Sequence, residues 1–180
     1  MTKLKLVHVP NTVLNTPVKE VEQVDQKIRN LVFDMEELLI TQVDPQGVGL
    51  AAPQVGKCLA IFIIKPSLKS KTEVFINPKI IMIEEGLKEK KQKKDEEDNK
   101  LEGCLSIPHV WGPVKRAAKV QLQYLDLNGQ MQTRWFSGFR ATIIQHEMDH
   151  LKGILFTRRA IEQKNSLYEE KDGELKKMEY

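Results

Sequence analysis

The chain has 180 residues, 41% hydrophobic and 29% charged, which is typical of one globular domain and excludes a fibrous or fully disordered protein. Its formal net charge of +3 is too small to indicate a nucleic-acid-binding protein. The two cysteines, Cys58 and Cys104, are too few for a disulfide-stapled secreted module, so they favour a reducing compartment.

The N-terminal segment Met1–Val9 alternates polar and apolar residues and lacks the apolar centre of a signal peptide. No run approaches the ~18 apolar residues of a membrane span, so the sequence predicts a cytoplasmic protein. Apolar residues then recur at spacings of three and four from Val18 to Thr41, which predicts an amphipathic helix. The turn cluster Asp44–Gly47 ends this helix and opens a glycine-rich stretch.

Short runs of β-branched and aromatic residues follow, and they predict strands at Cys58–Ile64, Thr72–Ile76 and Lys79–Ile83. Cys58 alternates with apolar neighbours in the first of these runs, so we interpret it as a core residue. Two later runs, Lys119–Leu125 and Met131–Phe136, flank an Asn-Gly pair and predict a β-hairpin.

The C-terminal part is predicted to be helical. One helix is expected over Phe139–Lys152, with Ser137 as N-cap and Gly153 as the C-terminal glycine, and a weaker one over Arg159–Glu170. This order of elements predicts an α+β fold with antiparallel sheets around a central helix, a single domain spanning residues 1–180.

One segment differs from the rest in composition. Leu87–Lys100 holds six lysines and five acidic residues among 14 residues and has almost nothing apolar to bury. It is predicted to be a charged surface loop. The acidic half nearly cancels the field of the basic half within a Debye length of ~8 Å, which argues against an RNA contact.

The residues best suited to metal binding and catalysis lie in the predicted helix over Phe139–Lys152. His146 and His150 are four residues apart, so on a helix they lie on one face and can reach one metal ion, with Glu147 beside it to serve a bound water. Helical spacing also places Phe139, Thr142 and Ile143 on the side of His146, as candidates for a substrate pocket.

A catalytic zinc-like centre needs a third protein ligand and an open position. The metzincin pattern would place a third histidine where this chain has Phe156. The other donors are His8, His109, a downstream glutamate or Cys104, which follows a glycine that lets the backbone approach closely. The downstream glutamates are Glu162, Glu169 and Glu170, in a charged final segment. Local sequence alone leaves Cys104 balanced between ligand and core residue.

Three motifs, in this order and at these spacings, closely resemble the peptide deformylase family. They are Gly47–Gln54, Glu102–Ser106 and Gln145–His150. The resemblance implies metal ligation by Cys104, His146 and His150, and removal of formate from the N-formylmethionine end of nascent polypeptides. It also implies that the Gln54 side chain and the Leu105 backbone N–H stabilise the oxyanion.

The chemistry of the residues agrees with this activity. A formamide is a poor electrophile, so its hydrolysis needs an activated water and a proton for the departing nitrogen, and Glu147 beside a divalent metal can move that proton. By resemblance, the backbone around Val48, Gly49 and Gly103 pairs with an extended peptide. Glu102 and Arg116 match a supporting ion pair of the family, while Trp111, expected in a loop after Pro108, departs from its pattern.

The resemblance also implies a cofactor and partners. One divalent ion per chain is expected, Fe²⁺ in the cell and Zn²⁺, Ni²⁺ or Co²⁺ as substitutes in a purified sample. The expected protein is a monomer that acts on nascent formylmethionyl peptides with a transient ribosome contact, and that binds neither a membrane nor specific nucleic-acid sequences. The alternatives are an endopeptidase built on the two histidines and Glu147, which would not need Cys104, and a binding module with a structural metal and a lysine-rich loop on ribosomal RNA.

Overall fold

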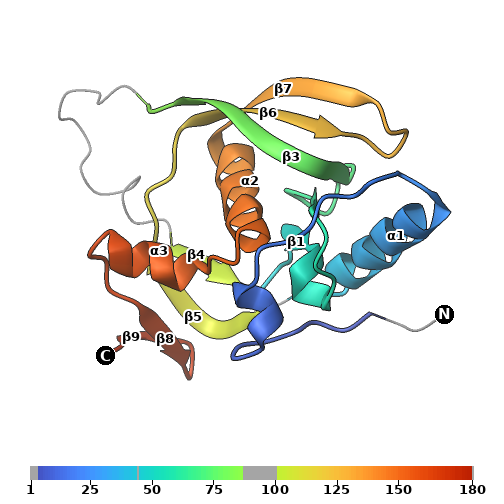
Figure 1. The fold of residues 1–180 in the computed structure, drawn as a ribbon. Helices are drawn as coiled ribbons and strands as arrows, with labels where there is room; N and C mark the ends of the chain where they lie inside the picture. The colour runs from blue at the N-terminus through green and yellow to red at the C-terminus, as the bar shows by residue number, and fades with distance from the viewer. Residues whose placement is uncertain (1–3, 44, 87–100, 180) are drawn as a thin grey trace.

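The computed structural model describes residues 4–43, 45–86 and 101–179, and the charged segment predicted at 87–100 lies outside them. Two antiparallel sheets enclose helix α2 (Gly138–Leu151), as Figure 1 shows. Helix α1 (Gln26–Ile40) and the short helix α3 (Phe156–Glu162) lie on the outside, and 3-10 turns η1 (Thr12–Asn15) and η2 (Ala52–Val55) complete the helical elements of the described residues. The predicted α+β class is confirmed.

The larger sheet has the strand order β1-β2-β3-β6-β7, formed by Gly49–Ala51, Ile61–Ile64, Glu73–Glu84, Lys119–Leu125 and Met131–Ser137. The smaller sheet has the order β4-β5-β8-β9, formed by Leu101–Cys104, Ile107–Pro113, Tyr168–Lys171 and Glu174–Lys177. Strands β1 and β4 are therefore both edge strands. The hairpin predicted from Asn128-Gly129 is present as β6 and β7, whose register runs from Lys119–Ser137 to Leu125–Met131.

Helix α2 is held by the core of the larger sheet. The ring of Phe75 on β3 lies 4.6 Å from those of Phe62 and Tyr124, and Ala141, Ile144 and Met148 of α2 belong to the same buried cluster. Apolar residues occur on several sides of α2, which is characteristic of a helix buried between layers. Gly153, just after the helix, has a φ of 69°, as expected of a C-terminal glycine, whereas Ser137 makes no side-chain capping bond. No helix among the residues placed by the structure is long and apolar enough to cross a membrane.

The predicted start of the first helix is wrong by eight residues. Helix α1 begins at Gln26 because Asp25 caps it, accepting a hydrogen bond from the Ile28 N–H at 3.0 Å. The preceding segment is irregular, and there the Val21 N–H is bonded to the Asn77 side chain at 2.7 Å instead of to a helical carbonyl. The spacing of apolar residues cannot reveal this hydrogen bond to a residue distant along the chain.

The two strands predicted at Thr72–Ile76 and Lys79–Ile83 are one strand, β3. Asn77, with a φ of 49°, and buried Pro78 produce an irregular register against β6 without ending the strand. Cys58 was also placed wrongly: it is half-buried and precedes β2, which starts at Ile61.

The predicted C-terminal helix over Arg159–Glu170 is wrong in extent. Helix α3 ends at Glu162, and the chain then forms the β8–β9 hairpin. Asp172 and Gly173 at its turn have φ values of 54° and 78°, the backbone that an Asp-Gly pair favours in a two-residue hairpin. The Asp-Gly pair is visible in the sequence, but the charged helical pattern before it led to the prediction of a longer helix.

Candidate metal centre

Three side chains from two elements meet between the sheets. Sγ of Cys104, at the end of β4, lies 3.2 Å from Nε2 of His150 on α2. The nearest donor atoms of Cys104, His146 and His150 all lie within 4.8 Å of one another, the one such group of three or more within residues 4–43, 45–86 and 101–179. Bonds of about 2.3 Å from sulfur and 2.1 Å from nitrogen to one ion can span these separations.

The structure decides between the third donors that the sequence left open. His8 and His109 are exposed and outside the cluster. Glu162 pairs with Arg158, and Glu170 accepts a hydrogen bond from Trp111 at 2.9 Å. Cys104 completes the group because the β4–β5 hairpin brings it under α2.

The neighbours of Cys104 favour the thiolate form, and a neighbour of His146 orients its ring. His146 Nδ1 lies 3.1 Å from Glu102 Oε2, which leaves Nε2 of His146 for an ion. Burial opposes ionisation of the Cys104 thiol, but the charge of His150 and hydrogen bonds with both histidines lower its pKa to about 5. One thiolate and two imidazoles fit zinc or ferrous iron with a position to spare.

Glu147 is the buried acid of the centre. It is 3% exposed, and its Oε2 atom has no hydrogen-bond partner within the structure. Burial raises the pKa of its carboxyl to about 7, although the charges of His146 and His150 act in the opposite direction. A carboxyl with a pKa near neutrality is suited to both accepting and returning a proton.

Gln54, on η2, faces the cluster from the larger sheet. Its Oε1 accepts a hydrogen bond from the Ala51 N–H at 2.8 Å, which fixes the amide orientation. Its Nε2 is therefore directed at Cys104 Sγ, 3.5 Å away, and at Ser106 Oγ, 3.3 Å away. This is a neutral donor held beside the metal ligands.

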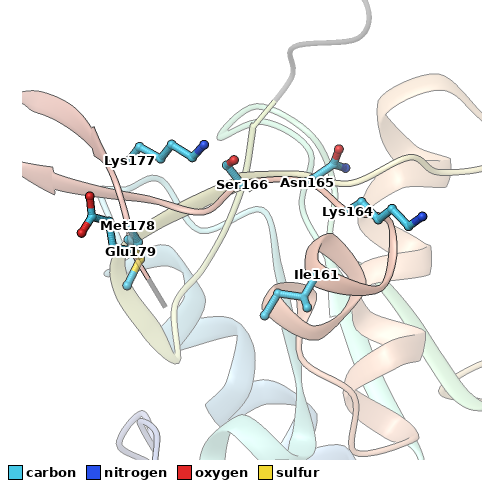
Figure 2. Close-up of a pocket in the computed structure, with 7 residues that line it drawn as sticks. All are labelled: Ile161, Lys164, Asn165, Ser166, Lys177, Met178 and Glu179. Carbon is cyan, nitrogen blue, oxygen red and sulfur yellow. The ribbon is translucent and has the colours of Figure 1, made fainter.

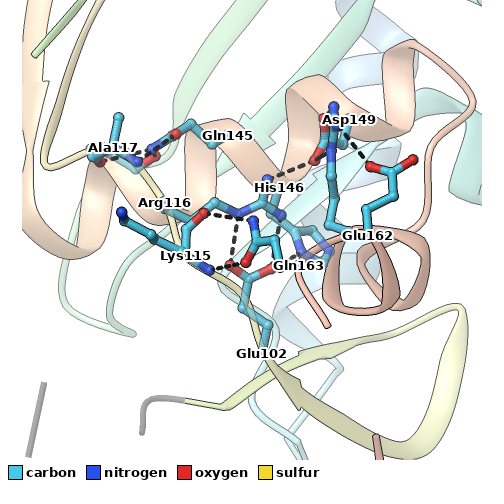
Figure 3. A network of polar contacts seen from close by, with 11 residues as sticks. Glu102, Lys115, Arg116, Ala117, Gln145, His146, Asp149, Glu162 and Gln163 are labelled. Carbon is cyan, nitrogen blue, oxygen red and sulfur yellow. Dashed lines mark hydrogen bonds and ion pairs between the residues drawn. The ribbon is translucent and has the colours of Figure 1, made fainter. Parts of the chain in front are cut away.

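A series of polar contacts extends outward from His146, and one pair in it was predicted from the sequence (Figure 3). The predicted Glu102–Arg116 pair is present as two hydrogen bonds of 2.8 and 2.9 Å. Arg116 also donates to Asp149 at 2.6 Å, and Asp149 in turn binds Arg159 of α3. Burial alone would raise the pKa values of Glu102 and Asp149, but their arginine partners lower both. Asp149 stood inside the recognised motif, but nothing in the sequence paired it with Arg159.

The predicted substrate residues are only partly brought together. Gly49 lies against Ile143 and Glu147, because a side chain added at Gly49 would collide with both. Val48 is half-buried and packs against the cluster that contains Ile143. Thr142 is half-buried, and Phe139 is 57% exposed near the start of α2. Trp111 lies in strand β5 rather than in a loop, and its ring covers the Cα of Gly103.

We expect Gly49→Ala to lower activity sharply while the metal is retained. A Cβ on Gly49 would lie 2.4 Å from Glu147 Oε1 and 2.8 Å from Ile143 Cγ2, so the carboxylate or the strand must move, and a displacement of about 1 Å costs about 100-fold in rate. Steady-state kinetics and metal content measure the effect. Gly86→Ala is the control, because Gly86 is exposed, outside the metal centre, and among the described residues its Cβ would meet the Ala118 Cβ at 3.2 Å. Equal activity in both variants would contradict the expectation.

A separate hollow of about 480 Å³ lies near the C-terminus and shares no residue with the metal centre (Figure 2). Its lining comes from α3, the segment after it and the end of the chain: Ile161, Lys164, Asn165, Ser166, Lys177, Met178 and Glu179. None of these belongs to the metal-ligand group, so the hollow is not a candidate for the same chemistry.

Comparisons with known proteins agree with the geometry. A family model described as polypeptide deformylase matches residues 3–166. The peptide deformylase of Dictyoglomus turgidum is 39% identical over 168 residues, covering 93% of this chain and 99% of that protein. That of Borreliella burgdorferi is 41% identical over 153 residues, covering 85% of each. A crystal structure of the Synechococcus elongatus peptide deformylase in complex with actinonin has a TM-score of 0.76 and 36% identity, covering 88% of this chain and 81% of that chain.

Proposed function

This chain belongs to the peptide deformylase family, and we propose that it releases formate from N-formylmethionine at the start of new polypeptides, with Glu147 moving the proton. The observation that carries the proposal is the meeting of the Cys104, His146 and His150 donor atoms, within 4.8 Å of one another, next to a buried carboxyl. An activated water and a proton carrier are two of the requirements of formamide hydrolysis.

A divalent ion held by Cys104, His146 and His150 would lower the pKa of water and draw electron density from the formyl oxygen. We expect Fe²⁺ in the cell and Zn²⁺, Ni²⁺ or Co²⁺ in purified samples. The donor set supports each of these, because one thiolate and two imidazoles suit several first-row ions.

Glu147 accepts the proton of the attacking water and delivers it to the nitrogen that departs. Its buried Oε2 supports this role, because no described side chain makes a hydrogen bond to that atom and it is free to accept a proton. The negative charge that develops on the formyl oxygen is stabilised by Nε2 of Gln54 and the N–H of Leu105. The fixed amide orientation of Gln54 supports that assignment, since a donor already in place needs no reorganisation.

The peptide binds in extended form against strands β1 and β4, with the backbone at Val48, Gly49 and Gly103 as partners. Both strands are edge strands, which leaves main-chain groups available for an added strand. The methionine side chain enters a pocket that includes Val48, Phe139, Thr142 and Ile143. Its apolar members support a preference for an apolar side chain, while the main-chain pairing tolerates varied residues after it.

The proposed enzyme is a single catalytic domain over residues 1–180 that acts as a cytoplasmic monomer and touches the ribosome transiently. The match of the family model to residues 3–166 supports one domain. The smaller sheet joins the Cys104 strand and β5 to the β8–β9 hairpin, about 60 residues further along the chain, which also supports one folding unit.

The proposal is tested with a formylmethionyl peptide and its acetylmethionyl counterpart. Formate and all peptide products are measured on the same sample. We expect formate from the first peptide, none from the second, and no internal cleavage of either. Cleavage at an internal peptide bond would instead support the endopeptidase alternative, and an inert, metal-loaded protein would support a binding module.

A further inference from the structure

Helix α3 contacts the metal centre through the Phe156 ring, which stacks on His146 at a centroid distance of 6.1 Å, and it also reaches the charged groups behind the centre through Arg159. Arg159 donates from Nη2 to Asp149 Oδ1 at 2.7 Å and from Nε to Asp149 Oδ2 at 3.0 Å. The Asp149 side chain is 7% exposed, so these are bidentate charge-assisted bonds to a buried carboxylate. Asp149 lies on α2 directly before the ligand His150.

From Asp149 the contacts continue to the other histidine. Arg116 donates one bond of 2.6 Å to Asp149 and two bonds to Glu102, whose Oε2 lies 3.1 Å from His146 Nδ1. Two buried carboxylates thus alternate with two guanidinium groups, and each carboxylate is bound by at least one arginine. Arg159 itself is 31% exposed, but removing a partner from either buried carboxylate leaves a buried charge less well compensated.

The backbone on both sides of Arg116 is also held by hydrogen bonds from glutamine side chains (Figure 3). The Gln163 side chain, just after α3, accepts from the Lys115 N–H at 2.7 Å and donates to the Lys115 carbonyl at 3.1 Å. The Gln145 side chain on α2 makes the same pair of bonds with Ala117, both at 3.0 Å. The Arg116 segment is therefore tied to α3 on one side and to α2 on the other.

We propose that Arg159 is a positioning residue of the metal centre: by holding Asp149 and Arg116 in place, it fixes the Glu102 carboxylate that orients the His146 ring. Without Arg159, Asp149 loses two of its three arginine hydrogen bonds and competes with Glu102 for Arg116. The His146 ring is then less firmly aimed at the ion, and the ion binds more weakly. This inference rests on the metal centre of the proposed function.

Co²⁺ is the probe, because its visible absorption reports both occupancy and thiolate ligation. We expect Arg159→Met to raise the Kd for Co²⁺ by about three- to tenfold, below the effect of a direct outer-shell partner. The matched control is Arg158→Met, on the same helix, whose Arg158 side chain is 66% exposed and pairs with Glu162. We expect its Kd to change by less than about twofold.

A double-mutant cycle separates positioning from general destabilisation. If Arg159 acts through Glu102, Arg159→Met should change the Kd by less than about twofold in a Glu102→Gln background. A purely structural role would instead lower the thermal midpoint by the same amount with and without Co²⁺. If Arg159→Met does not fold, the Kd for Co²⁺ is compared between Arg159→Lys and Arg158→Lys instead. Lysine keeps the charge of arginine but lacks its two parallel donors, so the same difference in Kd is expected.

The inference is overturned if Arg159→Met binds Co²⁺ as tightly as the wild type, or if its loss of affinity is unchanged in the Glu102→Gln background. Formate release is not used in any of these readouts. A protein that binds Co²⁺ as described but releases no formate would therefore refute the proposed function and leave the role of Arg159 standing.

Discussion

Replacing Glu147 with glutamine is expected to leave the bound metal in place and to lower kcat by about 10²- to 10⁴-fold, the usual contribution of a general acid–base group. The substitution keeps the size of the side chain and removes its ability to take up a proton. Glu147 is outside the three-residue donor group, so metal content should equal that of the wild type. Formate release and metal analysis on the same preparation measure both effects.

The same variant should not be less stable than the wild type. Burial raises the pKa of the Glu147 carboxyl from an ordinary value of 4.5 to about 7, so the metal-free folded state holds a proton that the unfolded chain releases between these values. Stability from this group therefore falls as pH rises through that range, and glutamine removes the penalty. Glu37→Gln, on the exposed side of α1, is the control for activity. Turnover within tenfold of wild type for Glu147→Gln would contradict the assigned role.

Cys104→Ala is expected to lose the metal, with zinc affinity reduced by at least about 100-fold. Loss of a direct ligand should cost more than the roughly 10- to 100-fold that changes to outer-shell partners cost. Two imidazoles remain, and the one anionic ligand is gone. Metal content after gel filtration and zinc titration against a chelator measure the loss. Formate release should fall in proportion to occupancy.

Cys58→Ala is the matched control, because Cys58 is the other free cysteine and belongs to no donor cluster among the described residues. We expect it to keep both zinc and activity. If Cys104→Ala retained tightly bound zinc and cleaved peptides internally, the two histidines would be acting with another donor, as the endopeptidase alternative requires.

The parts of the site that sequence could predict are those set by local geometry. His146 and His150 share a face because a helix places residues four apart together, and α2 is present where the apolar pattern predicted it. The β6–β7 hairpin follows from the turn preference of Asn-Gly. Cys104 was different, because local sequence was equally consistent with a core residue, and only the family resemblance identified a ligand.

The parts that sequence could not predict depend on partners distant along the chain. The start of α1 is set partly by Asn77, 56 residues from the backbone that it binds. Arg159 lay within the predicted last helix as one charged residue among many, and its partner Asp149 is revealed only when α3 packs beside α2. The β8–β9 hairpin is an exception, because the Asp172-Gly173 pair predicts it and the charged helical pattern concealed that signal.

The central claim is that one sulfur and two imidazole nitrogens bind the same ion and leave a position for water. X-ray absorption at the zinc edge of the zinc-loaded wild-type protein tests it most directly. We predict one sulfur at about 2.3 Å, two nitrogens at about 2.0 to 2.1 Å and one further oxygen ligand. A spectrum without sulfur, or with a fourth protein donor in place of the oxygen, would contradict the account.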